Sequence, residues 1–227
     1  PLHTVLNCTR ELADDFAGKL NRFSDKDGNN PTLSAGIAIV HHTEPLQESL
    51  ETMRRAEKEA KSVDGKNALA ITLSKRSGSD ATIKGSWRSD SNTNKSFDER
   101  LKWFVYLHLA ELLPSGVAHE LRNLWLRFRD ETDSQGKIKS GFEKIVKKEA
   151  FRIIKRKKTP DGRRNVSDEI FDQLKEFIEG SDLSVESLAK EIIVAKEFYK
   201  AYEQSDITAH EFAKENGFLQ KEVEGNE

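Results

Sequence analysis

Four residues in the first third of the chain have side chains suited to contact with a nucleotide. Ser34 and Gly36 lie in an apolar run that predicts a strand, and such small residues permit close approach by a ligand or by another backbone. Lys61 and Lys66 flank a loop that contains Gly65, so their ammonium groups could meet a polyphosphate from one side. The same pattern is typical of tight helix-on-sheet packing with solvated lysines, and the residues alone leave both interpretations open.

The stretch from 144 to 164 is the strongest concentration of positive charge in the chain. It holds ten lysine or arginine residues against Glu149 and Asp161. Apolar residues recur between them, which predicts an amphipathic basic helix able to neutralise nucleic-acid phosphates. We expect contact with nucleic acid or with another subunit at four consecutive residues: Lys155, Arg156, Lys157 and Lys158. A solvated face, or one that pairs with an acidic neighbouring subunit, is the alternative.

The sequence predicts no metal site within the chain. Asp14 and Asp15 fall in a predicted helix, where adjacent side chains point about 100° apart, so we expect both at the solvated surface. The histidines are scattered without the spacing of metal ligands. Cys8 is the single cysteine, which excludes an intramolecular disulfide and fits a reducing cytoplasm. No run approaches ~18 apolar residues, so we expect no membrane span.

The elements that position these residues follow from the hydrophobic pattern. Helical spacing over 2–23 and an apolar run over 32–42 predict a helix and then a strand buried on both faces. An amphipathic helix is expected over 44–63, and strands over 67–76 and 81–87 form a hairpin through the turn Ser-Gly-Ser-Asp. The first two strands are then joined by a parallel crossover. The inward stripe of the 44–63 helix is predicted at Leu46, Leu50, Met53, Ala56 and Ala60.

The character of the chain changes after a polar segment over 89–96, which we interpret as a linker. It separates a first domain over 1–88 from an all-α domain over 97–227, so the fold class is α+β. Helices are predicted over roughly 97–113, 115–131, 137–157, 166–179, 184–203 and 208–215. Three strands are few to bury the first of them on both faces. We therefore expect sequence outside residues 1–227 to complete the first domain, with this chain as a C-terminal part.

Several motifs carry a resemblance to known proteins. The segments "TLSAGIA", "AEKEAK" and "GKNALAI" resemble the second half of palm-type nucleotidyltransferase and cyclase domains. Lys66 stands where the diguanylate cyclases have arginine, and one extra residue separates Lys61 from Gly65. Together, "GIAIVHHTEPL" and "KNALAITLSKRSG" are similar to the large subunit of type III CRISPR–Cas effector complexes, most like its Cmr (III-B) form. A free-standing diguanylate-cyclase-like domain is disfavoured because it leaves the helical half unexplained.

The resemblance implies a fold and a function. The fold is the C-terminal portion of a ferredoxin-like palm domain followed by a helical domain. The longer protein would convert ATP to cyclic oligoadenylate on binding target RNA, with Mg or Mn held by a Gly-Gly-Asp-Asp turn that residues 1–227 lack. No catalytic residue is then expected in this chain; Ser34 and Gly36 would line the pocket, and Lys61 and Lys66 would contact phosphates.

The resemblance also implies partners. They are the other subunits of the effector complex, guide RNA, target RNA and single-stranded DNA, in the cytoplasm and without a membrane. The alternative hypothesis is a catalytically inactive palm plus a helical module that serves subunit assembly and nucleic-acid binding.

Overall fold

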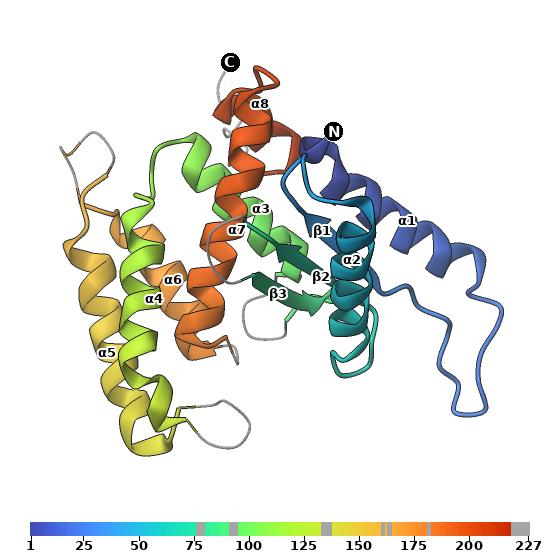
Figure 1. The fold of residues 1–227 in the computed structure, drawn as a ribbon, viewed down its shortest axis with the longest axis horizontal. Helices are drawn as coiled ribbons and strands as arrows, with labels where there is room; N and C mark the ends of the chain where they lie inside the picture. The colour runs from blue at the N-terminus through green and yellow to red at the C-terminus, as the bar shows by residue number, and fades with distance from the viewer. Residues whose placement is uncertain are drawn as a thin grey trace, which may run out of the picture. The chain divides into compact units, whose positions relative to one another are not determined.

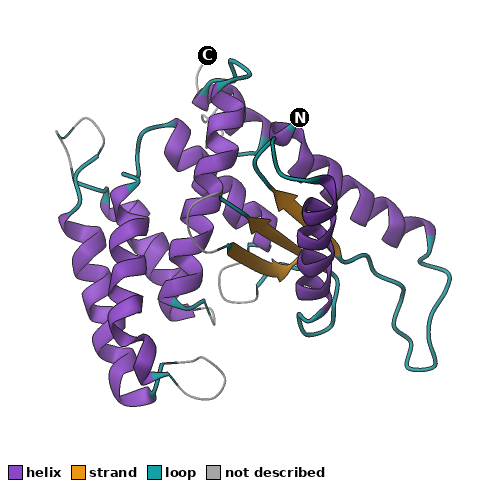
Figure 2. Cartoon of the chain, in the orientation of Figure 1, coloured by secondary structure: helices purple, strands orange, loops and turns teal. Residues whose placement is uncertain are grey.

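The computed structural model of the chain describes residues 1–75, 80–90, 95–132, 138–159, 162, 165–180 and 183–218. They divide into two units, Pro1–Arg100 and Leu101–Glu227. The elements are η1 (Leu2–Thr4), α1 (Val5–Lys19), β1 (Ala35–Ile39), α2 (Leu46–Lys61), β2 (Ala68–Leu73), β3 (Ala81–Ser86), α3 (Phe97–Leu109), α4 (Gly116–Phe128), η2 (Arg129–Glu131), α5 (Ser140–Arg156), α6 (Asp168–Gly180), α7 (Val185–Glu203) and α8 (Ala209–Glu215) (Figure 1). All three strands lie in the first unit (Figure 2).

The sheet has the order β1-β2-β3. β1 pairs with β2 in parallel, from Ala35 opposite Leu69 to Ile39 opposite Leu73, and β2 pairs with β3 antiparallel. The predicted crossover and hairpin are therefore confirmed, and the α+β class with them, although turn residues 76–79 lie outside the described residues. The first strand was expected to be buried on both faces, and the described part of residues 1–227 does not by itself bury it. β1 is a half-buried edge strand, whereas all six residues of the central β2 are buried.

The helix α2 covers one face of the sheet through Ala56 and Ala60, which belong to the predicted stripe, and not through the larger members of that stripe. Its buried residues are Thr52, Ala56 and Ala60. Leu46 is 75% exposed, and Leu50 and Met53 are also exposed. The reason is close approach: small residues occupy the line where the helix meets β1, and the larger apolar residues are turned to the flank of the helix.

The opposite face of the sheet is covered by the first turn of α3. Side chains alternate between faces along a strand, and Lys84 of β3 reaches α2, so Gly85 faces away from α2. A Cβ on Gly85 would lie 2.6 Å from Cβ of Phe97, which shows how closely α3 begins against β3. The connecting segment 89–96 is described only in part, because residues 91–94 lie outside the described residues.

The helix α1 is shorter than predicted. A 3-10 turn precedes it, and it ends at Lys19 where a helix to residue 23 was expected. Leu6 and Ala13 are buried, whereas Leu12 is 58% and Phe23 51% exposed. Turn-forming residues follow, and the positive φ of Gly28 (82°) closes a tight turn that the Asp25 carboxylate supports by accepting N–H bonds.

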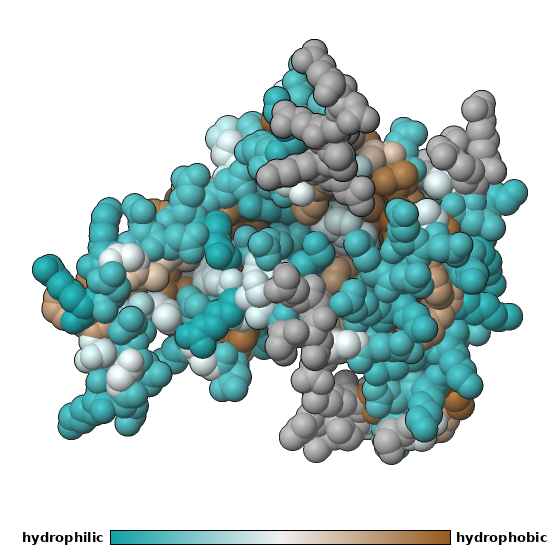
Figure 3. Space-filling model, turned by 180° about the vertical axis from the view of Figure 1, so that it is seen from behind, coloured by the Kyte–Doolittle hydropathy of each residue, from teal (hydrophilic) through white to brown (hydrophobic). Residues whose placement is uncertain are grey.

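The second unit is built from helices. α4 packs against both α5 and α7, and the rings of Trp103 and Phe104 on α3 contact Phe177 of α6 at 5.5 and 6.0 Å between centroids. Hydrophilic residues dominate the surface in Figure 3. Among the described residues, no helix is long and apolar enough to cross a membrane.

Candidate functional site

The topology brings the four predicted nucleotide contacts to one end of the strands, the amino ends of β1 and β2. Since β1 and β2 are parallel, their amino ends lie side by side. Ser34 directly precedes β1, Gly36 is its second residue, Lys61 ends α2, and Lys66 lies two residues before β2. The four residues predicted from sequence therefore lie at the same end of the β1–β2 pair.

Gly36 is fixed by packing at this end. A Cβ there would lie 2.4 Å from the backbone nitrogen of Glu57 and 2.9 Å from the carbonyl carbon of Ala56. The backbone of α2 therefore rests on β1 with no room for a side chain. This contact supports the packing interpretation of Gly36, and a nucleotide contact from Gly36 stays a prediction.

Replacing Gly36 with alanine tests this contact. Gly36→Ala is expected to lower the free energy of unfolding by about 1–3 kcal/mol, because α2 must move to admit the methyl group. Gly18 in α1 is a matched control, since no described atom lies within 4 Å of a Cβ built on it. Gly18→Ala should be neutral or stabilising by up to about 1 kcal/mol. Equal urea midpoints for the two variants would contradict the packing role.

Lys61 is engaged with a carboxylate in this structure. Its Nζ lies 2.6 Å from Oε1 of Glu57, one turn earlier on α2, and the Lys61 side chain is 55% exposed. The hydrogen bond from Lys61 holds the pKa of Glu57 below its usual range. Exposed pairs of this kind contribute little to stability. A phosphate could therefore replace Glu57 as the partner of Lys61 at small cost.

Lys66 lies in a left-handed turn. Gly65, Lys66 and Asn67 have φ values of 69°, 53° and 49°. Left-handed backbone is unfavourable for residues with a Cβ, and two hydrogen bonds hold it: Lys66 N–H donates to Val63 O at 2.8 Å, and Asn67 O accepts from Trp87 N–H at 2.9 Å. The turn presents the exposed Lys66 beside the start of β2.

A third cation lies near this turn and was missed from sequence. Lys84 of β3 donates to Oε2 of Glu59 at 2.7 Å and to Oγ of Ser62 at 2.9 Å. The alternation of side chains along β3 could have indicated that Lys84 faces α2. Lys61, Lys66 and Lys84 thus surround the end of α2 and the turn that follows it.

A hollow runs along α2, from Glu44 before its first turn to Lys58 in its last turn. It is lined by Glu44, Glu48, Glu51, Thr52, Arg54, Arg55, Lys58 and Ser74. A hydrogen bond between the carboxyl groups of Glu44 and Glu48 raises the pKa of Glu48. Over the described ranges, the structure contains no group of three histidine, cysteine or acidic residues that could hold a metal ion. Asp14 and Asp15 are exposed, as expected, and pair with Arg10 and Lys19.

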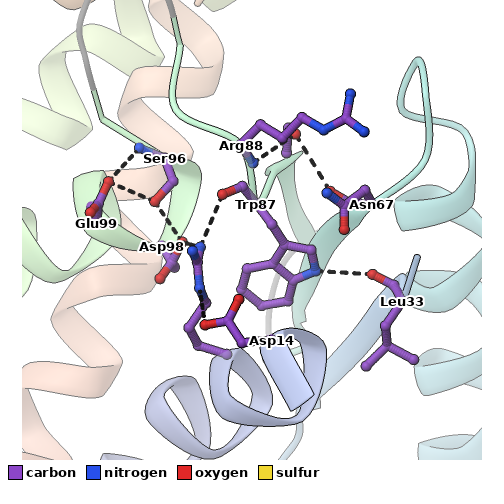
Figure 4. Close-up of polar contacts among 10 residues, drawn as sticks. Asp14, Leu33, Asn67, Trp87, Arg88, Ser96, Asp98 and Glu99 are labelled. Atoms are coloured by element: carbon purple, nitrogen blue, oxygen red, sulfur yellow. Dashed lines mark hydrogen bonds and ion pairs between the residues drawn. The ribbon is translucent and has the colours of Figure 1, made fainter. Parts of the chain in front are cut away.

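A polar cluster that the sequence did not reveal joins α1, the end of β3 and the start of α3 (Figure 4). Arg10 Nη1 donates to Trp87 O at 2.9 Å and to Oδ1 of Asp98 at 3.2 Å. Asp98 also accepts from Ser96 Oγ at 2.8 Å, and Trp87 Nε1 donates to Leu33 O at 3.1 Å. Arg10 and Asp98 are 88 positions apart, so no local sequence pattern predicts this pair. The cluster fixes the segment that leads into β1.

The predicted basic run lies at the end of α5 in the second unit. Two of its four members are turned toward α4: Arg156 Nη2 lies 2.7 Å from Oε2 of Glu120, and Lys157 Nζ bonds Oε1. Hydrogen bonds from Lys157 and Arg156 hold the pKa of Glu120 below its usual range. Lys155 lies over the ring of Phe171, while Lys158 is exposed. Asp161, Arg163 and Arg164 of the predicted stretch lie outside the described residues.

Comparison with known proteins finds similarity in residues 1–70 and, with one relative, over 65% of the chain. The family model of the second palm domain of Cas10/Cmr2 matches residues 1–70. The chain is 32% identical over 151 residues to the CRISPR system Cmr subunit Cmr2 of Pyrococcus furiosus, an alignment that covers 65% of this chain and 15% of that protein. No solved structure matches the chain. The resemblance seen in the sequence is therefore confirmed: residues 1–70 are similar to the second palm domain of Cas10/Cmr2, and the chain is similar to a type III-B Cmr2 subunit over 151 residues.

Proposed function

We propose that the chain forms part of the nucleotide site in a type III-B large subunit that converts ATP to cyclic oligoadenylate when target RNA binds. One observation carries the proposal. Residues 1–70, which match the second palm domain, fold as a parallel βαβ unit with Ser34, Gly36, Lys61 and Lys66 at the amino ends of its strands. The site would accept a triphosphate because cations surround these ends, with Lys84 as an added member.

The proposed chemistry is attack of a ribose 3′-hydroxyl on an α-phosphate, with release of pyrophosphate. Mg or Mn would supply charge neutralisation at the phosphates, held by carboxylates of the Gly-Gly-Asp-Asp turn outside residues 1–227. The role of this chain is narrower: Lys61 and Lys66 bind phosphate oxygens, and the backbone near Ser34 limits the pocket. The partners would be the remaining subunits of a cytoplasmic complex, guide RNA, target RNA and single-stranded DNA.

The free edge of β1 supports the proposal that this unit is one portion of a ferredoxin-like palm. β1 is apolar along its length, and within the described residues its only paired strand is β2. The flank of α2 toward β3 is polar, with Arg55 bonded to Asp80. At 100° per residue, Leu46, Leu50 and Met53 lie on the other flank of α2, toward the free edge of β1. A further strand of the longer protein would pair with β1 and cover these side chains.

The lysine at the end of α2 gives the sharpest test. Lys61→Ala in the full-length protein is expected to reduce oligoadenylate formation about tenfold or more, because a charged hydrogen bond to phosphate is worth about 1.5–3 kcal/mol. Assembly of the complex should not change, since Lys61 is exposed and its pair with Glu57 lies within one helix. Product is measured from ATP with target RNA and with Mg or Mn.

Lys58 is the control: it lies in the same last turn of α2 as Lys61, but its side chain lines the hollow together with Arg54 and Arg55. Lys58→Ala should keep full activity. Equal product from parent and Lys61→Ala would remove Lys61 from the site. If the parent itself yields no product while the complex assembles, the alternative holds: an inactive palm with a helical module for assembly and nucleic-acid binding.

A further inference from the structure

The outward face of α5 carries only cations and a glycine. Val146, Ala150, Ile153 and Ile154 are buried and define the inward side of the helix. With 100° between successive residues, the positions opposite that side are Gly141, Lys144, Lys148, Lys155 and Arg152. All five are exposed. We call Lys144, Lys148, Arg152 and Lys155 the α5 stripe. All four lie in the basic stretch 144–164 predicted from sequence, but only Lys155 is one of the four residues at which contact was expected.

The stripe is only partly neutralised by its own helix, through Arg152. Glu143 and Glu149 lie on the two flanks, where Glu143 pairs with Lys147 at 2.8 Å and Glu149 with Arg152 at 2.8 Å. Lys144 and Lys148 form neither an ion pair nor a side-chain hydrogen bond with any described residue. Arg156 and Lys157, by contrast, are already satisfied by Glu120 on α4. The charge available to a partner therefore extends along the helix and is not confined to its end.

We propose that the α5 stripe binds the phosphate backbone of a nucleic-acid strand. Successive members lie about 4.5–6 Å apart along the axis, since each residue rises about 1.5 Å. A line of exposed cationic groups suits a chain of phosphates, because contact with the backbone depends on charge and carries no sequence information. A protein partner fits less well, because lysine is depleted at protein interfaces and aromatic residues are enriched; no aromatic side chain lies in the stripe, and Ile145 beside it is the exposed apolar neighbour.

The proposal extends the nucleic-acid part of the proposed function, but it is tested without ATP and without the longer protein's active site. The probes are a fluorescent 20-nucleotide uridine RNA and a thymidine DNA of equal length, titrated with the chain over a series of NaCl concentrations. The stripe variant carries Lys144→Gln, Lys148→Gln and Lys155→Gln. The control carries Lys175→Gln, Lys190→Gln and Lys200→Gln, which make the same change of charge on α6 and α7.

The stripe variant should bind at least about tenfold more weakly, and its slope of log K against log salt should fall by about 2, at about 0.7 per lost phosphate contact on a single strand. The control should bind like the parent. Equal affinity for RNA and DNA assigns the contact to phosphates alone, and preference for RNA adds a contact to the 2′-hydroxyl. Equal weakening in both variants, or unchanged binding in the stripe variant, would each overturn the proposal. Circular dichroism melting checks that both variants remain folded.

Discussion

Arg10→Met is expected to lower the free energy of unfolding of the first unit by about 3 kcal/mol or more. The substitution leaves the carboxylate of Asp98, whose side chain is 3% exposed, without its cationic partner. A buried charge stripped of its partner is costly, typically about 3–5 kcal/mol. The Trp87 carbonyl also loses the N–H of Arg10, and the indole of Trp87 loses the guanidinium 5.8 Å from its centre. Urea unfolding of the chain measures the loss, and hydrogen exchange of β2 locates it in the first unit.

The same arginine provides its own control. Arg10 Nε pairs with Asp14 at 3.0 Å, but the Asp14 side chain is 63% exposed. Asp14→Ala should therefore change the free energy of unfolding by no more than about 1 kcal/mol. The double variant Arg10→Met with Asp98→Leu should recover much of the loss, because it removes the buried charge together with its partner. Equal costs for Arg10→Met and Asp14→Ala would show that the buried pair is not what holds the cluster.

Local patterns predicted the order of elements well. The alternation over 81–87 and the apolar run over 67–76 predicted a hairpin, and the crossover between the first two strands was readable from the amphipathic helix between them. These signals depend on residues a few positions apart, so the sequence carries them directly. The helices of the second unit were predicted to within a few residues for the same reason.

The orientation of α2 could not be read in this way. The hydrophobic pattern placed Leu46, Leu50 and Met53 in the inward stripe together with Ala56 and Ala60. Close contact between Gly36 and the backbone of α2 instead selects the alanines, and this constraint is visible only once the strand lies under the helix. A glycine in a predicted strand next to an alanine-containing helix is the signal that could have suggested it.

Pairs distant in sequence were beyond prediction. Glu120 forms ion pairs with Arg156 and Lys157 of the basic run. A count of charges along 144–164 treats both cations as unpaired. Lys84 and Glu59 meet only because β3 lies beside the end of α2. The residue types of the candidate site were therefore readable from the sequence. The carboxylates that pair with Lys61 and Lys84 became visible only in the fold.

His108 in the second unit makes stability depend on pH. The imidazole is buried on α3, and Nε2 lies 3.3 Å from Ile192 O of α7. Burial lowers the pKa of His108 to about 4, against an ordinary value of 6.5. Between these two values the unfolded chain binds a proton that the folded chain does not. The contribution of His108 to the free energy of unfolding is therefore complete above pH 6.5 and is lost as the pH falls toward 4, by up to about 3 kcal/mol.

His108→Gln should accordingly flatten the dependence of unfolding on pH between 6.5 and 4.5, measured by urea titration at several pH values. The glutamine cannot bind the proton, so the unfolded chain gains nothing at this position on acidification. His119→Gln on α4 is the matched control, because that imidazole is exposed and its replacement should leave the slope as in the parent. If the parent and His108→Gln lose stability in parallel as the pH falls, acid sensitivity arises from groups other than His108, and its burial does not govern the second unit. If only His108→Gln flattens the slope, the pH response arises from the imidazole that α3 holds against α7. The sequence, with its six scattered histidines, did not indicate which of them would be buried.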